Sequence, residues 1–422
     1  MRLHRRDLFR ASASGLLSAM AYRALERAAF AGDMPAAPSA GTAKAKSVIV
    51  LWMNGGPSHV DTWDPKPGSK VQGPHKAIAT RTKGLLVSEH LPRLAQLSDK
   101  YAVVRGTSKE GNHQRAQYFL RTGYAPNPTV VHPSLGGWVS RKLGAPKNGL
   151  PGFVSVGGPS LGAGFLGVQH GPFVLGKGGD LPSNTGYGPS VERARFMARK
   201  ALLEQTEADF ARFTGDPKVQ GHAQVYDKAE QLMHSADLPA FDISKEPEKV
   251  RAAFGDTDFG RGCLGALRLV ERGVPFVEVS LDGWDTHVDN FTKTKNLMGT
   301  LDPAMSALIT ELERRGKLSN TIVLWMGDFG RTPKINGNDG RDHHPGAWSA
   351  VLAGGGITKG VVHGETDADA EKVVKDAVTA PNLLATVATA LGLDPAESFL
   401  TPIGRPISIT DHGAPIPALL RG

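Results

Sequence analysis

The chain contains a single cysteine among its 422 residues, Cys263, so it can form no disulfide within itself. No CxxC pair surrounds Cys263, and we expect a small buried side chain there rather than a metal ligand or a nucleophile. Aromatic residues make up only 7% of the chain, and no basic stripe with interleaved aromatic residues occurs. This composition argues against nucleic acid as a partner.

Long apolar runs are also missing from the sequence beyond its first 31 residues. No stretch there approaches the roughly 18 apolar residues that a membrane-spanning helix requires, so we expect no stable membrane span. The formal net charge of +8 is unevenly placed, because residues 1–31 carry six arginines against Asp7 and Glu26. The remaining positive charge is scattered, as in a mildly basic globular protein.

The first 31 residues predict export. The segment HRRDLFR at 4–10 contains the pair Arg5-Arg6 followed by apolar residues, and it resembles a twin-arginine export signal. A modestly apolar stretch follows, and an A-x-A triplet at 29–31 offers a cleavage site. The alternative is an ordinary amphipathic helix, since charged residues at 23, 26 and 27 interrupt the apolar run. We predict a twin-arginine signal peptide at 1–31, a flexible linker at 32–46, the twin-arginine export machinery as a partner, and a periplasmic or secreted location.

Strand-like and helix-like segments alternate along residues 47–422. Continuous apolar runs at 48–53, 274–280 and 321–326 are typical of strands buried in a parallel sheet. Residues 302–316 predict a helix that begins at Asp302-Pro303 and ends at Gly316. Residues 190–255 are charged and helical without strand signals, which predicts a helical insertion. The predicted fold class is therefore α/β, one domain with a mostly parallel central sheet flanked by helices.

Polar side chains follow several of these strands at the point where each strand ends. Ligands lie at the carboxyl ends of the strands in an open α/β sheet, and carboxylates, amides and imidazoles delivered there can bind a metal. Neighbours on an extended chain point in opposite directions, so we expect only one of the adjacent histidines 343 and 344 to be a direct ligand. The candidates are Asn54 and Ser58, Asp285 and His287, Asp328 and Arg331, and His343 and His344.

Arg331 has two possible partners. It lies three residues after Asp328 and is expected either to pair with that carboxylate or to bind an anionic group of a substrate in bidentate fashion. The second role would offset the negative charge of a phosphate or sulfate.

The order of these segments resembles the alkaline phosphatase superfamily, to which the sulfatases belong. The stretches GGPSHVDTWDPKPG, GRTP and GRDHHPGAW are more closely similar to a sulfatase-related family of exported bacterial proteins with a domain of unknown function. The resemblance covers nearly the whole mature chain and implies an alkaline-phosphatase-like sandwich. It places Asn54 at the first metal-binding Asp of the superfamily. It places the later ligands at Asp285, His287, Asp328 and either His343 or His344.

The expected helix HQRAQYFLRTG at 113–123 resembles the sulfatase segment that carries the nucleophile. His113 stands where sulfatases have a modified Cys or Ser, and Gln117 stands where they have an Arg. Because a histidine cannot become formylglycine, His113 is either a metal ligand or itself a nucleophile. Otherwise Ser58, Thr62 or a metal-bound water attacks, or the fold has lost hydrolysis altogether.

Together these residues predict an exported, metal-dependent hydrolase of phosphate or sulfate esters. The substrate would be an anionic ester such as a sulfated or phosphorylated glycan, and the cofactor a divalent metal: zinc, calcium or manganese. His113, Ser58 and Arg331 are the catalytic candidates. The alternative is a non-catalytic, metal-stabilised binding or scaffolding protein for glycans or anionic polymers.

Overall fold

The computed structural model describes residues 45–179, 182–183, 185–188, 191–214 and 218–421. The predicted signal peptide at 1–31 lies outside these residues, as does the predicted linker apart from 45 and 46.

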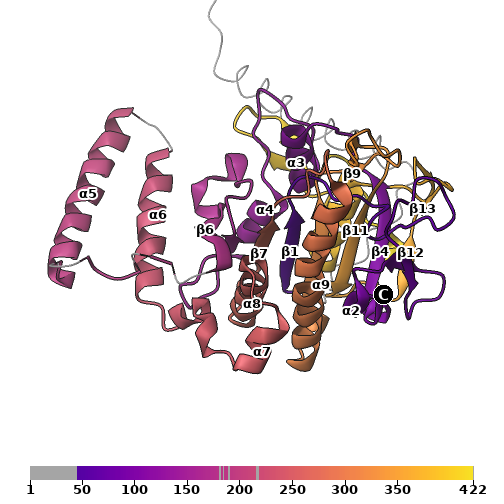
Figure 1. Cartoon of the computed structure of the whole chain (residues 1–422). Helices are drawn as coiled ribbons and strands as arrows, with labels where there is room; N and C mark the ends of the chain where they lie inside the picture. Colours follow the sequence, from indigo (N-terminus) through magenta and orange to yellow (C-terminus); the bar gives the residue numbers. More distant parts are fainter. Residues whose placement is uncertain (1–44, 180–181, 184, 189–190, 215–217, 422) are drawn as a thin grey trace, which may run out of the picture. The chain divides into compact units, whose positions relative to one another are not determined.

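A nine-stranded sheet forms the centre of the described chain (Figure 1). Its middle strands, β1 (Ser47–Met53), β7 (Phe276–Leu281) and β8 (Thr321–Gly327), are parallel neighbours. One strand, β11 (Trp348–Gly354), runs antiparallel between β8 and β4 (Tyr101–Thr107). The outer members are β5 (Phe153–Val156), β6 (Phe173–Leu175), β12 (Val361–His363) and β15 (Val378–Thr379), and each pairs in parallel. The predicted α/β class with a mostly parallel sheet is confirmed.

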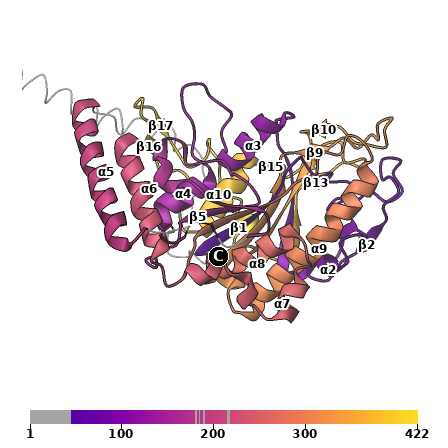
Figure 2. The ribbon, with the colours of Figure 1, turned by 60° about the vertical axis from the view of Figure 1, so that its left-hand side comes forward.

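Helices cover both faces of the sheet, as Figure 2 shows. Strand β1 is buried along its whole length, with Ile49, Leu51 and Met53 in one core and Val48, Val50 and Trp52 in the other. The first core contains residues of α2 (Pro92–Ala95), α8 (Asp258–Glu271) and α9 (Asn290–Arg314). The second contains residues of α3 (His113–Thr122), α4 (Leu135–Leu143) and α10 (Ala380–Ala390). Burial on both faces explains why β1 reads as an unbroken apolar run.

The first core also contains the single cysteine. Cys263 lies on α8 and is fully buried. Burial raises the pKa of its thiol, which suits the packing role expected from the sequence.

The helix predicted to start at Asp302 instead begins twelve residues earlier, at Asn290, and Pro303 lies inside it. The carboxylate of Asp302 accepts hydrogen bonds from the backbone N–H groups of Arg93 (3.1 Å) and Leu94 (2.9 Å). Asp302 therefore satisfies donors at the start of α2 rather than at the start of its own helix.

Residues 190–255 hold α5 (Arg193–Thr214), α6 (Lys218–Met233) and α7 (Glu248–Ala253), and no strand lies among the residues described there. Helices α5 and α6 lie side by side at one edge (Figures 1 and 2). Helix α5 buries none of its described side chains. That this segment is an insertion into the domain stays a prediction.

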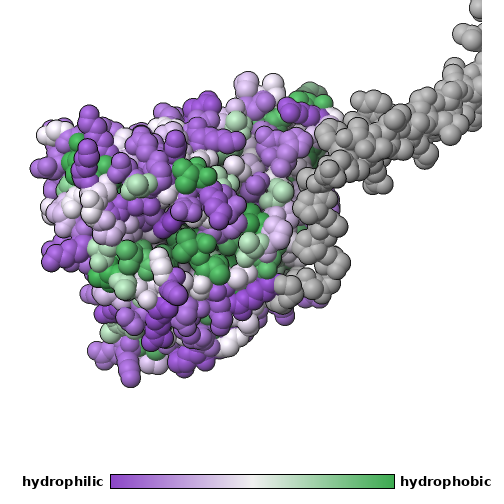
Figure 3. Space-filling view, turned by 90° about the vertical axis from the view of Figure 1, so that its right-hand side faces the viewer, coloured by the Kyte–Doolittle hydropathy of each residue, from purple (hydrophilic) through white to green (hydrophobic). Residues whose placement is uncertain are grey.

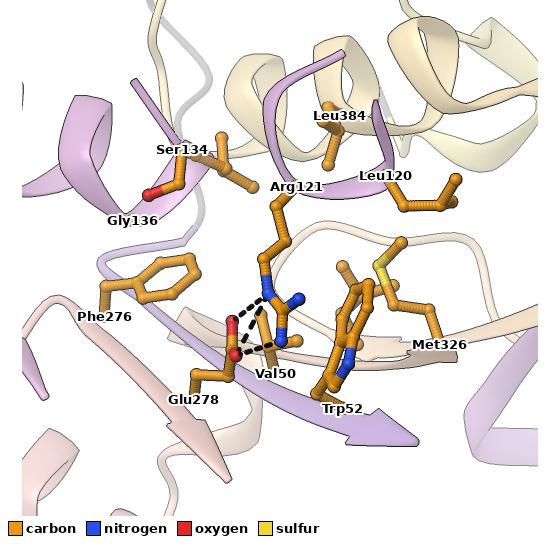
Figure 4. Close-up of a pocket in the computed structure, with 12 residues that line it drawn as sticks. Val50, Trp52, Leu120, Arg121, Ser134, Gly136, Phe276, Glu278, Met326 and Leu384 are labelled. Atoms are coloured by element: carbon orange, nitrogen blue, oxygen red, sulfur yellow. Dashed lines mark hydrogen bonds and ion pairs between the residues drawn. The ribbon is translucent and has the colours of Figure 1, made fainter. Parts of the chain in front are cut away.

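Helix α3 is anchored to the sheet through an ion pair beneath it (Figure 4). Arg121 donates to Glu278 of β7 at 2.8 Å, and its guanidinium lies 3.5 Å from the ring centroid of Trp52 on β1. His113, Gln117 and Arg121 are spaced four residues apart and so share one face of the helix. The anchor at Arg121 therefore turns His113 and Gln117 toward the end of the sheet.

Short hairpins surround the main sheet. Two of them carry histidines at or beside their strands: β2 (Ala77–Ala79) with β3 (Leu86–Ser88), and β9 (Gly330–Arg331) with β10 (His343–His344). The others are β13 (Glu365–Thr366) with β14 (Val373–Lys375), and β16 (Phe399–Leu400) with β17 (Pro406–Ile407).

The surface in Figure 3 is mostly hydrophilic, with hydrophobic residues in small groups between polar ones. Among the described helices, none is both long enough and apolar enough to cross a bilayer.

Candidate metal centre

The ends of three neighbouring strands bring the candidate residues to one edge of the sheet. Met53, Leu281 and Gly327 are aligned across β7, β1 and β8, so the residues that follow them emerge together. Asn54, Asp282 and Asp328 are those residues. The α3 helix begins close by, with Asn112 accepting a hydrogen bond from the Arg115 N–H at its N-terminus.

One carboxylate oxygen, Oδ1 of Asp285, is the centre of the cluster. The Nε2 atoms of His287, His343 and His113 lie 3.2, 3.3 and 3.4 Å from it. The Nη2 atom of Arg331 donates to the same oxygen at 2.6 Å. Three imidazoles from three separate segments therefore converge on one carboxylate.

Each of these imidazoles donates its Nδ1–H to an oxygen of the protein. Carboxylates and carbonyls only accept hydrogen bonds, so Nδ1 carries a proton, and Nε2, which faces the cluster, has a lone pair whenever the ring is neutral. The Nε2 atoms of His287 and His343 lie 2.8 Å apart. The acceptors are Asp328 Oδ2 for His113 at 2.8 Å, Asp342 Oδ1 for His287 at 2.7 Å, and the carbonyl of Gly111 for His343 at 2.8 Å. Metal-binding histidines are held in this way.

The charges in the cluster shift several pKa values. Partial burial raises the pKa of Asp285, but the hydrogen bond and charge of Arg331, with His113, outweigh it and hold the pKa at about 2. The hydrogen bond to Asp328 raises the pKa of His113. Burial lowers the pKa of His343, and the hydrogen bond from His287 lowers that of Asp342. Asp285 is therefore a fixed negative charge at neutral pH.

The side-chain amides of Gln117 and Asn54 form hydrogen bonds with the carboxylates at the strand ends. Gln117 Nε2 donates to Asn54 Oδ1 at 2.7 Å and to Asp328 Oδ2 at 3.2 Å. Asn54 in turn donates to Asp282 Oδ1 at 3.0 Å. The oxygen of Asn54, predicted as a metal ligand, is thus engaged with Gln117, and Asp328 is a fully buried carboxylate that orients His113.

Arg331 pairs with Asp285 and not with Asp328, its neighbour in sequence. Its side chain is fully buried, and the guanidinium also donates to the carbonyls of Gly55, Gly56 and Arg341. These contacts engage the guanidinium N–H groups with protein oxygens and hold the carboxylate of Asp285 in place. The predicted bidentate contact between Arg331 and a substrate anion does not fit this burial.

Ser58 lies in the turn after β1. It is 0% exposed, and its hydroxyl oxygen accepts from the Asp61 N–H at 3.2 Å. Thr62 is equally buried and donates to the Ser58 carbonyl at 2.6 Å. A nucleophilic role for either hydroxyl does not fit this burial, because an ester could not reach them.

Of the two adjacent histidines, only His343 joins the cluster. His344 follows it on β10 and bonds through Nε2 to the carbonyl of Glu371 at 2.6 Å, with its ring stacked on that of His59. The alternation of side chains along an extended strand separates them.

Sequence reasoning did not assign Asp342 or the Gly111 carbonyl. Asp342 lies directly before the histidine pair, so its place in the GRDHHPG stretch was the available signal. Gly111 contributes only a backbone oxygen, for which the sequence holds no signal.

The cluster fits a divalent cation. The Nε2 atom of His113 is buried and has no hydrogen-bond partner among the described residues. Ligating atoms of His113, Asp285 and His343 all lie within 4.8 Å of one another. Imidazole nitrogens with one carboxylate oxygen are a ligand set that divalent transition metals accept.

Comparison with known proteins gives one family and several distant structures. No curated protein matches the chain. A sulfatase from Pseudoalteromonas sp., PsFucS1, is similar at 14% identity over 84% of this chain and 69% of that one, with a TM-score of 0.38. A protein in the alkaline phosphatase superfamily from Vibrio parahaemolyticus is similar at 11% identity, over 85% and 69%, with a TM-score of 0.35. The lipoteichoic acid synthase LtaP from Listeria monocytogenes is similar at 9% identity, over 86% and 76%, with a TM-score of 0.37. The family model described as "Protein of unknown function (DUF1501)" matches residues 45–420, and the chain belongs to this family.

Proposed function

We propose that this protein is a metal-dependent hydrolase of phosphate or sulfate esters. The observation that carries the proposal is the convergence of three Nε2 atoms on Oδ1 of Asp285, each with its Nδ1 committed to a protein oxygen. A divalent cation among these groups would bind the Nε2 lone pairs and balance the charge of the carboxylate. The twin-arginine motif near the N-terminus supports a site of action in the periplasm or outside the cell.

His113, Asp285 and His343 would hold the cation. When bound, a divalent metal supplies Lewis-acid polarisation of an ester oxygen and lowers the pKa of water. Two imidazoles and one carboxylate favour zinc over calcium, which prefers oxygen ligands alone.

The remaining residues of the cluster orient those ligands. Arg331 fixes the rotamer of Asp285, and Asp328 fixes the tautomer of His113 by accepting its Nδ1 proton. Both supporting side chains are fully buried, so water does not compete for these contacts.

His287 with Asp342 forms the acid–base pair. Its Nε2 atom faces the cluster and its side chain is 41% exposed, so solvent and substrate can reach it. Nε2 takes a proton from the attacking water, and Asp342 stabilises the imidazolium that results through the 2.7 Å hydrogen bond at Nδ1. As the water oxygen bonds to phosphorus or sulfur, the bond to the alkoxide oxygen breaks, and the same proton passes from Nε2 to that departing oxygen.

An exposed lysine beside Asp282, at the end of β7, supports an anionic substrate. A cleft of about 200 Å³ at the ends of β5 and β7 is lined by Lys177 and Asp282, among others. Lys177 is 69% exposed, and its Nζ atom lies 4.0 Å from Asp282 Oδ2. The ammonium group can attract the phosphate or sulfate of a glycan ester to this edge of the sheet.

The second candidate function is metal-stabilised binding of glycans or anionic polymers without catalysis. Two observations favour it: a histidine occupies position 113, and the nearest predicted hydroxyl nucleophiles, Ser58 and Thr62, are fully buried. This function needs the same ligands but no acid–base pair.

Metal analysis and an ester screen on the same variants test the proposal. Asp285→Asn and His343→Gln should lose the bound metal and all turnover of aryl phosphate, aryl sulfate and sulfated oligosaccharides. His287→Gln should keep the metal and lose turnover by about 10²- to 10⁴-fold. His344→Gln is the matched control, since its side chain points away from the cluster and both properties should persist.

Two results would contradict the proposal in different ways. Stoichiometric metal with no turnover of any ester would favour the binding function. No metal in the parent protein, even after incubation with excess zinc, would rule out both.

A further inference from the structure

A second group of imidazoles and a carboxylate lies at the open end of the β2–β3 hairpin and shares no residue with the candidate centre. The hairpin register pairs Ala77 with Ser88. The pairing continues outward, because the Glu89 N–H donates to the Lys76 carbonyl at 2.8 Å. His75 and His90, one residue further along each arm, are brought opposite each other.

The separation of the two ring nitrogens is close to that of two nitrogen ligands bound to one zinc ion. His75 Nδ1 and His90 Nε2 are 3.1 Å apart, and the rings stand nearly perpendicular at 85°. Two nitrogens bound at about 2.0–2.1 Å in a tetrahedral zinc site are separated by roughly 3.3 Å. A carboxylate oxygen of Glu89 completes the group, and the three ligating atoms lie within 4.8 Å of one another.

A buried threonine sets the tautomer of His75. The Thr294 hydroxyl on α9 donates to the Asn290 carbonyl at 2.6 Å, so it can only accept from His75 Nε2, 3.2 Å away. The proton of His75 is therefore on Nε2, and the Nδ1 lone pair faces His90. His75 is 7% exposed and Thr294 is 1% exposed, so the arrangement is shielded from water on this side.

The other two residues leave room for an ion to enter. Glu89 is positioned by the Lys76 N–H, which donates to Oε1 at 2.9 Å, and within the part of the chain that the structure describes its Oε2 atom accepts no hydrogen bond. Glu89 and His90 are half-buried, whereas His75 packs edge-on against Phe291 of α9 at 5.5 Å between ring centroids. Figure 2 shows β2 beside α9 and α2 on this side of the molecule.

We propose that His75, Glu89 and His90 form a second zinc site, with water in the remaining position. The ion would tie the β2–β3 hairpin to the first turns of α9 through His75 and its partner Thr294. The site shares no residue with the candidate centre around Asp285, so the proposal does not depend on the hydrolase function.

The test uses the full chain with the first cluster removed by Asp285→Asn and His343→Gln. We expect this background to bind one equivalent of Zn²⁺, measured by equilibrium dialysis with elemental analysis, and Co²⁺ to give visible absorption bands. Adding His90→Asn or Glu89→Gln should weaken zinc binding by at least about tenfold. His363→Asn, a half-buried histidine on β12 outside both clusters, is the matched control and should change nothing.

Thermal unfolding separates loss of the site from loss of the fold. Zinc should raise the Tm of the background and of the His363→Asn control, but not that of the His90→Asn variant, and all three should have similar Tm values in EDTA. No zinc bound by the background, or zinc binding unchanged by both His90→Asn and Glu89→Gln, would overturn the proposal. In that case the 3.1 Å contact is an ordinary hydrogen bond between two histidines.

Discussion

Two turns at the same edge of the sheet contain the same residue types, but the side chains of one are buried and those of the other are exposed. One follows β1 and contains His59 and Asp61; the other follows β7 and contains Asp285 and His287. Each places one aspartate and one histidine two residues apart, just beyond a buried parallel strand.

The turn after β1 is a structural element. Asp61 forms a bidentate ion pair with Arg341, at 2.7 and 3.1 Å, and both side chains are fully buried. His59 is 1% exposed and bonds to the Ala370 carbonyl through Nε2. In the turn after β7, by contrast, Asp285 is 49% and His287 41% exposed. The two turns share their residue types and differ in burial, so we expect a supporting role for the first turn and a role in chemistry for the second.

The largest effect should come from breaking the buried pair after β1. Asp61→Asn leaves the charge of Arg341 buried without its counterion, which should cost about 3–5 kcal/mol of unfolding free energy. Urea unfolding measures the loss. The control is Asp342→Asn, which breaks the exposed ion pair with His287 of the turn after β7 (side chains 55% and 41% exposed), where we expect a change within about 1 kcal/mol. Equal losses in the two variants would contradict the distinction between the turns.

A pH dependence follows from His59. Burial lowers the pKa of His59 to about 4, below the value of about 6.5 in the unfolded chain. Between those values the unfolded chain binds a proton that the folded chain does not, so stability should fall as the pH drops from about 6.5 to about 4. The difference amounts to about 3 kcal/mol.

The parent and a His59→Gln variant should be compared by urea unfolding at several pH values in this window. The variant should lack this part of the acid-induced loss. Parallel pH profiles for the two proteins would show that His59 is not held neutral by burial.

At the exposed pair of His287 and Asp342, the effect should fall on turnover and not on stability. Asp342→Asn removes the carboxylate that orients His287 and stabilises its imidazolium, so it should lower turnover by about 10- to 100-fold and leave the metal bound. Turnover of an ester that the parent hydrolyses measures the change against His344→Gln, two positions away on the same segment. Unaltered turnover in Asp342→Asn would remove Asp342 from the acid–base pair.

The smallest effect is expected at Ser58. Ser58→Ala removes one hydrogen bond in the closed turn and should cost about 1 kcal/mol of unfolding free energy. Turnover of any ester that the parent hydrolyses should stay within about twofold, because no step uses this hydroxyl. Abolished turnover with an intact fold would instead restore Ser58 as the nucleophile.

The strands of the sheet were predictable because burial on both faces demands continuous apolar runs. The runs at 48–53 and 321–326 match β1 and β8 to within one residue at each end. The start of α9 at Asn290 could not be predicted from the sequence pattern. Asp302-Pro303 looks like a helix start in sequence, but its carboxylate caps α2, more than 200 residues earlier in the chain.

The sequence by itself determined where a site could be. Apolar runs dictate parallel strands, and the polar residues that follow those runs must emerge at one edge of the sheet. Only the tertiary structure decided which of those residues face one another. The tautomers of His113 and His75 are set by Asp328 and Thr294, each more than 200 residues away along the chain. Hydrogen bonds across such separations depend on packing, so local sequence patterns carry no record of them.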